Sequence, residues 1–115
     1  MDICFEGIGQ MVATFRTEDE TLEAGMAVTL TGNGEVGPGG EDDPLCGVTV
    51  SAERGGAVAV QIGGVVKVGC SDGKAPGVGW QELACGGTGK VKTAGTGGMK
   101  FLVLAADEKS VVIKL

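Results

Sequence analysis

The chain has 115 residues, of which 43% are hydrophobic but only 3% aromatic, and its formal net charge is −6. This length fits a single domain, and the acidic balance argues against a nucleic-acid partner, which needs clustered lysines and arginines. The N-terminus has no signal-peptide pattern, and no apolar run is long enough to cross a membrane. We therefore expect a protein made and kept in a reducing cytoplasm, with no membrane partner.

Twenty-three glycines separate short apolar runs, as turns and bulges do in β-structure. The composition predicts an all-β fold, as a small single-domain barrel, β-tulip or sandwich. Residues 1–10 are expected to form an arm or an edge strand. A polar connection at 16–23 and glycine- and proline-rich loops at 37–44 and 71–79 separate the strands. The predicted strands, in chain order, are 11–16, 27–31, 35–36, 48–52, 57–62, 65–68, 80–85, 89–92, 100–106 and 110–115.

The clearest hairpin spans residues 45–62, two alternating strands around a turn at 53–56 that contains Gly55 and Gly56. Side chains in a strand alternate between its two faces. The alternation assigns Val48, Val50, Ala52, Val58, Val60 and Ile62 to a core face. It assigns Thr49, Ser51 and Gln61 to the outer face.

The hairpin has a counterpart at residues 100–115, and other patterns recur at nearly the same distance. Gly32-x-Gly34-x-Val36 returns 55 positions later as Gly87-x-Gly89-x-Val91. The strand at 48–53 returns after 54 positions, and the strand at 58–62 returns after 53. The sequence thus predicts two similar halves, about 24–63 and 79–115, which together close one barrel or sandwich.

Charge differs between the two parts of the chain. Residues 1–63 have a balance of −9, and residues 64–115 have a balance of +3. The simple interpretation is solubility, and the alternative is that acidic and basic faces meet between neighbouring subunits. Glu41, Asp42 and Asp43 form an acidic loop that either binds a hard cation such as calcium or is a solvated tip.

Catalytic and cofactor chemistry has little support in this sequence. The chain has no histidine and no tyrosine, so the commonest general base is missing. Its cysteines (Cys4, Cys46, Cys70 and Cys85) lack zinc-ligand spacing and are expected to be small buried side chains. Gly32-Asn33-Gly34-Glu35-Val36-Gly37 matches a dinucleotide fingerprint but runs into Pro38, which favours a hairpin turn over a helix. We expect no enzyme, no metal and no cofactor.

Several segments resemble a known family when read in order. They are Gly25-Met26-Ala27-Val28-Thr29-Leu30, Gly32-Asn33-Gly34-Glu35-Val36 and Cys46-Gly47-Val48-Thr49-Val50, followed by residues 63–68, 79–80 and 89–93. Together they resemble the small head decoration proteins encoded beside major capsid genes in tailed phages and prophages. The resemblance implies a β-barrel or β-tulip that is made in the bacterial cytoplasm and binds the major capsid protein on the virion head surface, often as a trimer. It carries over no catalytic residue.

Two functions are therefore expected, a structural capsid protein or, as the alternative, a small ligand- or glycan-binding module with Trp80 as its platform. A core or edge-packed position for Trp80 is the simpler interpretation. For the structural protein, the second hairpin has apolar side chains where the first has polar ones. Phe101, Val103 and Val112 are therefore the candidate subunit contact.

Overall fold

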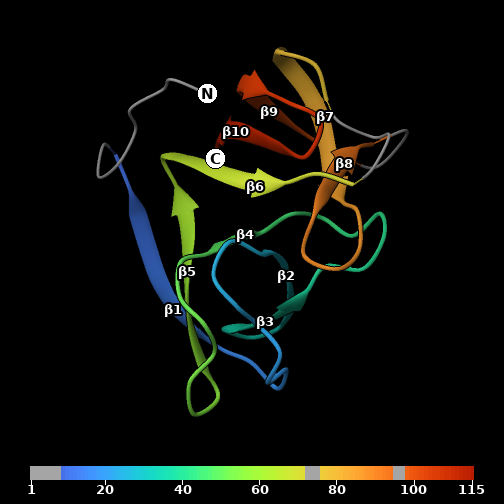
Figure 1. Cartoon of the computed structure of the whole chain (residues 1–115). Helices are drawn as coiled ribbons and strands as arrows, with labels where there is room; N and C mark the ends of the chain where they lie inside the picture. Colours follow the sequence, from blue (N-terminus) through green and yellow to red (C-terminus); the bar gives the residue numbers. More distant parts are fainter. Residues whose placement is uncertain (1–8, 72–75, 95–97) are drawn as a thin grey trace.

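The computed structural model describes residues 9–71, 76–94 and 98–115, which form ten β-strands and no helix (Figure 1). The all-β prediction is confirmed. Cys4 and most of the expected N-terminal arm lie outside the described residues. The strands are β1 (Met11–Arg16), β2 (Ala27–Gly32), β3 (Glu35–Pro38), β4 (Gly47–Thr49), β5 (Ala57–Gly63), β6 (Val65–Gly69), β7 (Gly79–Cys85), β8 (Val91–Thr93), β9 (Met99–Ala106) and β10 (Ser110–Lys114).

The first five strands form a closed barrel in the order β1-β3-β2-β4-β5. Neighbours are antiparallel except β1 and β3, whose parallel pairing of Arg16 with Glu35 closes the barrel. The Asn33-Gly34 turn joins β2 to β3, and Gly34 has the positive φ of 64° that this turn needs. The match to a dinucleotide fingerprint is thus a hairpin turn, as predicted.

The other five strands form a second sheet in the order β6-β10-β9-β7-β8. A parallel bridge between Cys70 and Val91 links its two outer strands. If β1 to β5 are matched in turn to β6 to β10, this is the strand order of the first barrel, followed around the ring in the opposite direction. In Figure 1 the barrel occupies the lower part of the view and the second sheet the upper part.

The strand register follows the sequence offsets in the hairpins. Val48 pairs with Gln61 in the barrel. Leu102, 54 positions after Val48, pairs with Lys114, 53 positions after Gln61. The β7–β8 hairpin matches the β2–β3 hairpin at an offset of 55. With β2 matched to β7 at this offset and Val48 matched to Leu102, the pairing of β7 with β9 is displaced by two residues from the pairing of β2 with β4. A displacement of two keeps each side chain on the same face, because side chains alternate with a period of two.

The buried side chains form two clusters, and the wall made by β2 and β4 lies between them. One cluster fills the barrel and contains Leu22, Val28, Val36, Val58 and Val60. The other is the core of the second sheet, and it also includes Ala27, Leu45 and Val48 from the first part of the chain. Neighbouring residues of β2 therefore point into different cores, and the wall has no solvent face at Ala27 and Val28.

The predicted core face of the first hairpin is wrong at Val50 and Ala52, which are exposed. Its predicted outer face is wrong at Thr49 and Gln61, which are both buried. Their polar groups have partners inside the protein. The Thr49 hydroxyl donates to the carbonyl of Glu23 and accepts the backbone N–H of Met26 at 2.9 Å. The Gln61 amide donates to the carbonyls of Gly63 at 2.9 Å and Val65 at 3.0 Å, where β5 continues into β6.

The outward position of Phe101, Val103 and Val112 is also wrong, because all three side chains are buried. Phe101 and Val103 belong to the core cluster of the second sheet. Val112 lies on the face opposite Val111 and Ile113, which belong to that core, and its side chain is buried on this second face as well. Side chains buried within one chain offer no surface to another subunit.

The connection between β1 and β2 is only partly the solvated segment that its composition predicts. Leu22 enters the barrel, where its side chain is 1% exposed. Polar neighbours turn the chain locally, since Asp19 accepts the backbone N–H of Thr21 at 2.7 Å and Thr17 accepts that of Asp19 at 3.1 Å. Leu22 thus closes the barrel core from a segment of mostly acidic residues.

Candidate interaction surface

The outer face of β7 and β9 presents the most exposed aromatic residue of the described chain. In β7, Trp80 and Glu82 point outward, whereas Leu83 and Cys85 are buried. In the antiparallel β9, Leu102 lies opposite Trp80 and Lys100 lies opposite Glu82. We call these four residues the Trp80 face. It combines an apolar pair with an adjacent pair of opposite charges.

Trp80 is 67% exposed, so a core position is wrong, and of the two expected positions the one at a strand edge remains. Val78, two residues earlier, is 68% exposed and extends the apolar surface beyond the start of β7. Leu102 is half-buried beside Trp80. Large apolar side chains grouped on a surface in this way are typical of contact sites with other molecules.

Near Trp80, β7 has a neighbouring strand on one side only, among the described residues. β8 pairs with β7 only from Leu83 to Cys85. Gly79, Trp80 and Gln81 pair with β9 alone among the described strands. An edge of this kind presents backbone N–H and C=O groups beside the Trp80 side chain, and such groups can contact a further chain.

Exposed apolar side chains also occur on the barrel. Met11 and Val12 of β1 lie at an irregularity in the β1–β5 pairing, and both are exposed. Leu30 of β2 is 58% exposed. Both sheets therefore present apolar side chains to the surroundings, at positions that differ from the predicted contact of Phe101, Val103 and Val112.

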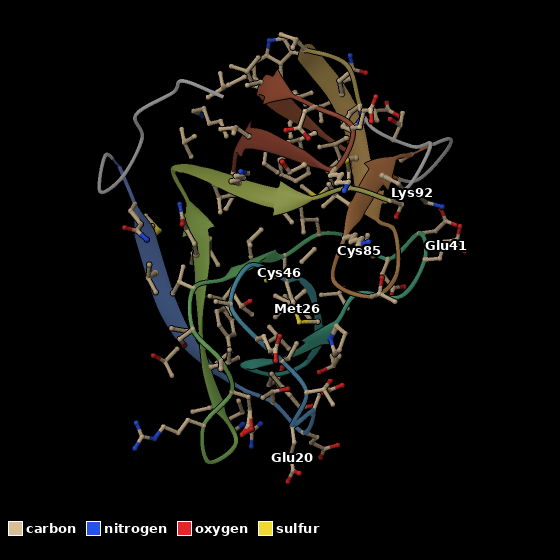
Figure 2. All side chains as sticks on the ribbon, in the orientation of Figure 1. Glu20, Met26, Glu41, Cys46, Cys85 and Lys92 are labelled. Atoms are coloured by element: carbon tan, nitrogen blue, oxygen red, sulfur yellow. The ribbon has the colours of Figure 1, made fainter. Side chains whose placement is uncertain are left out.

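The acidic loop forms a contact inside the chain. The Lys92 ammonium lies 2.7 Å from an Asp42 carboxylate oxygen and 3.1 Å from one of Glu41 (Figure 2). These hydrogen bonds, with that of Asp42 the larger influence, raise the pKa of Lys92. Asp43 accepts the backbone N–H of Cys85 at 2.9 Å, and Asp42 donates its own N–H to the Cys85 carbonyl.

The loop therefore joins the acidic part of the chain to the basic part within one molecule. No group of three or more acidic or cysteine side chains in the described residues is placed to hold a metal ion. Glu41 and Asp42 point toward an ammonium group instead, which leaves the calcium interpretation without structural support. The solvated-tip interpretation is also incomplete, because the backbone of this loop pairs with β7.

The described cysteines differ in burial. Cys70 and Cys85 are buried as predicted, and Cys46 is half-buried. Burial, with a smaller effect from the Asp43 charge, raises the pKa of the Cys85 thiol to about 11. Burial also raises the pKa of Cys46. Both thiols stay protonated at neutral pH, and a protonated thiol is a poor nucleophile.

In comparisons with known proteins, no family model and no curated sequence matches this chain. The described residues include no helix with the length and apolar character needed to span a bilayer.

Proposed function

We propose that the protein is a non-enzymatic structural protein that decorates the head of a tailed phage or prophage and stabilises the capsid lattice. The sequence resemblance to head decoration proteins is one support for this proposal. The observation that carries it is the distribution of exposed apolar side chains over both sheets. A subunit of a surface lattice needs contacts to the shell and to its neighbours at the same time.

In this proposal the barrel contacts the major capsid protein through β1. Met11 and Val12 are exposed at the start of that strand. Apolar side chains at the centre of an interface give most of the binding energy, whereas polar residues at the rim contribute little. The protein would form a homo-oligomer on the head surface, and the family resemblance favours a trimer.

The test is co-sedimentation with empty shells assembled from the major capsid protein that is encoded nearest to the gene. We expect saturable binding in a fixed ratio to capsid subunits, and shells that resist heating better when decorated. Met11→Asp should weaken binding at least tenfold, which corresponds to about 1.4 kcal/mol. Thr14→Asp is the matched control, because it adds the same charge at an exposed position of the same strand.

Wild-type protein that stays in the supernatant at every shell concentration would refute the capsid role. Equal weakening by both substitutions would leave the capsid role in place but refute β1 as the contact.

The exposure of Trp80 favours one alternative, a small glycan-binding module. A sugar ring stacks on an exposed aromatic side chain, and Trp80 provides one. The two described phenylalanines, Phe15 and Phe101, pack with the cores and add no second platform. Because Trp80 is the single tryptophan, its fluorescence reports directly on this site. An emission change that saturates with one glycan of a panel would support the alternative over the capsid role.

A further inference from the structure

We infer that the Trp80 face is a self-association surface, which packs against the same face of a second copy of this chain. The face consists of Trp80, Glu82, Lys100 and Leu102 on β7 and β9, with the exposed Val78 beside it. The inference goes beyond the capsid role and does not depend on it, because the protein alone is sufficient for the tests below.

The first reason is the equivalent face in the other half of the chain. Leu102 matches Val48 at the repeat offset of 54, and counted from it the pair of Trp80 with Leu102 takes the place of the pair of Ala27 with Val48. Counted along the β7–β8 hairpin, Glu82 on the same face takes the place of Ala27. Ala27 and Val48 are both completely buried, since they fill the core of the second sheet. In the barrel, the outer face of β2 and β4 is therefore a packing surface, and the second sheet of the same chain covers it.

The second half has larger apolar groups at that place, and the described residues do not cover them to a comparable extent. Trp80 replaces Ala27, and Leu102 replaces Val48, yet Trp80 is two-thirds exposed. Tryptophan is strongly enriched among the residues that dominate protein interfaces. The large apolar pair fits a surface that is covered by another molecule.

The third reason identifies a second copy as that molecule. The net charge of −6 opposes the approach of two copies in general. On the Trp80 face, however, Glu82 lies directly opposite Lys100, so the charge is locally balanced. Under two-fold symmetry a face contacts itself, and Glu82 of each copy can then meet Lys100 of the other. The face is self-complementary in both its apolar and its charged parts.

The first test measures mass by sedimentation velocity over a wide range of protein concentration. Wild type should form a two-fold species, and Trp80→Glu should halve its mass, whether from dimer to monomer or from hexamer to trimer. The milder Trp80→Ala should raise the dissociation constant at least about thirtyfold, as loss of a dominant interface residue does. Leu30→Glu is the matched control, because it places the same charge at an exposed apolar strand position of the barrel.

The second test uses charge reversal to separate contacts between copies from contacts within one copy. Glu82→Lys alone places two like charges on each face, and Lys100→Glu alone does the same with the opposite sign. Each variant should fail to self-associate. A mixture of the two should form a mixed dimer, because every charged contact between the different copies is then between opposite charges.

Three results would overturn the inference. One is wild-type protein that stays monomeric at the highest concentrations, and another is an unchanged mass for Trp80→Glu. The third is a mixture of charge-reversed variants that forms no mixed species while circular dichroism shows both to be folded. If wild type is monomeric but Trp80→Glu abolishes binding to shells, the face contacts the capsid instead of a second copy.

Discussion

Replacing Leu22 with alanine tests whether the acidic connection between β1 and β2 is part of the barrel core. The Leu22 side chain is 1% exposed and packs with Val28, Val36, Val58 and Val60. Substitution of a buried leucine by alanine removes apolar contacts and leaves a cavity, at a cost of about 2–5 kcal/mol. We expect about 3 kcal/mol for Leu22→Ala, because a connecting segment can relax partly into the space.

This free energy converts into a melting temperature. Globular proteins have an unfolding entropy of about 2.1 cal/mol/K per residue near 60 °C, or about 0.24 kcal/mol/K for this chain. A loss of about 3 kcal/mol should therefore lower the melting temperature by about 12 °C. Urea unfolding should give the same loss of free energy with an unchanged slope, since the surface exposed on unfolding stays the same.

Leu30→Ala provides the matched control, because Leu30 is 58% exposed on β2. Substitutions on the surface usually change stability by no more than about 0.5 kcal/mol. If Leu22→Ala costs no more than Leu30→Ala, the connection is a solvated loop, as its polar sequence suggests, and its assignment to the core is wrong.

Three further predictions concern buried and paired polar groups. Thr49→Val should cost about 1–3 kcal/mol in urea unfolding, because the backbone groups of Glu23 and Met26 lose the buried hydroxyl that pairs with them, whereas Thr49→Ser should retain most of the stability. Backbone N–H groups of Lys109 and Ser110 lower the pKa of Asp107, so its stabilisation is complete above the unfolded pKa and is lost as the pH falls through the lower folded value. Unfolding measured below about pH 4 should therefore depend less on pH in Asp107→Asn, and an unchanged slope would contradict this role. The raised pKa of Lys92 acts in the opposite sense, so its contribution is complete below the unfolded pKa and is lost as the pH rises through the higher folded value. Lys92→Met should flatten the decline of stability above about pH 10.5, and a decline as steep as that of wild type would refute the contact.

The strands of this protein were largely predictable because two local signals agree along the chain. Alternating apolar residues mark the strands, and glycine-rich turns separate them. β1 has the predicted bounds, Met11–Arg16, and the other nine strands overlap the predicted ranges. The sequence offsets of 54 and 53 also reproduce the pairing of β4 with β5 in β9 and β10.

The faces of the strands were less predictable, because alternation assumes that one side of a strand meets water. β4 lies between two cores, so Val48 and Thr49 are both buried although they point in opposite directions. In β10, Val112 is likewise buried although it points away from the core that contains Val111 and Ile113. Neither effect leaves a signal within the strand concerned, since both depend on the packing of distant segments.

The candidate surface was only partly predictable from the sequence. Trp80 could be singled out because it is the only tryptophan, but a lone tryptophan is usually buried. The pairs of Trp80 with Leu102 and of Glu82 with Lys100 depend on the β7–β9 register. That register is displaced by two residues from the hairpin offset of 55, so the repeat matches Trp80 to Gly25, whereas the pairing with Leu102 matches it to Ala27.

The separation of the two cores has a consequence for the order of events during synthesis. The barrel cluster and the residues packed against it all lie between Phe15 and Ile62, so this core is complete before the second sheet leaves the ribosome. Ala27, Leu45 and Val48, however, belong to the second core, whose other buried members all come from residue 66 onward. The newly synthesised barrel therefore exposes these apolar side chains until the C-terminal half of the chain has folded against them. A ribosome that stalls between β5 and β10 would leave this wall exposed, and chaperones would have a binding site on an otherwise folded barrel.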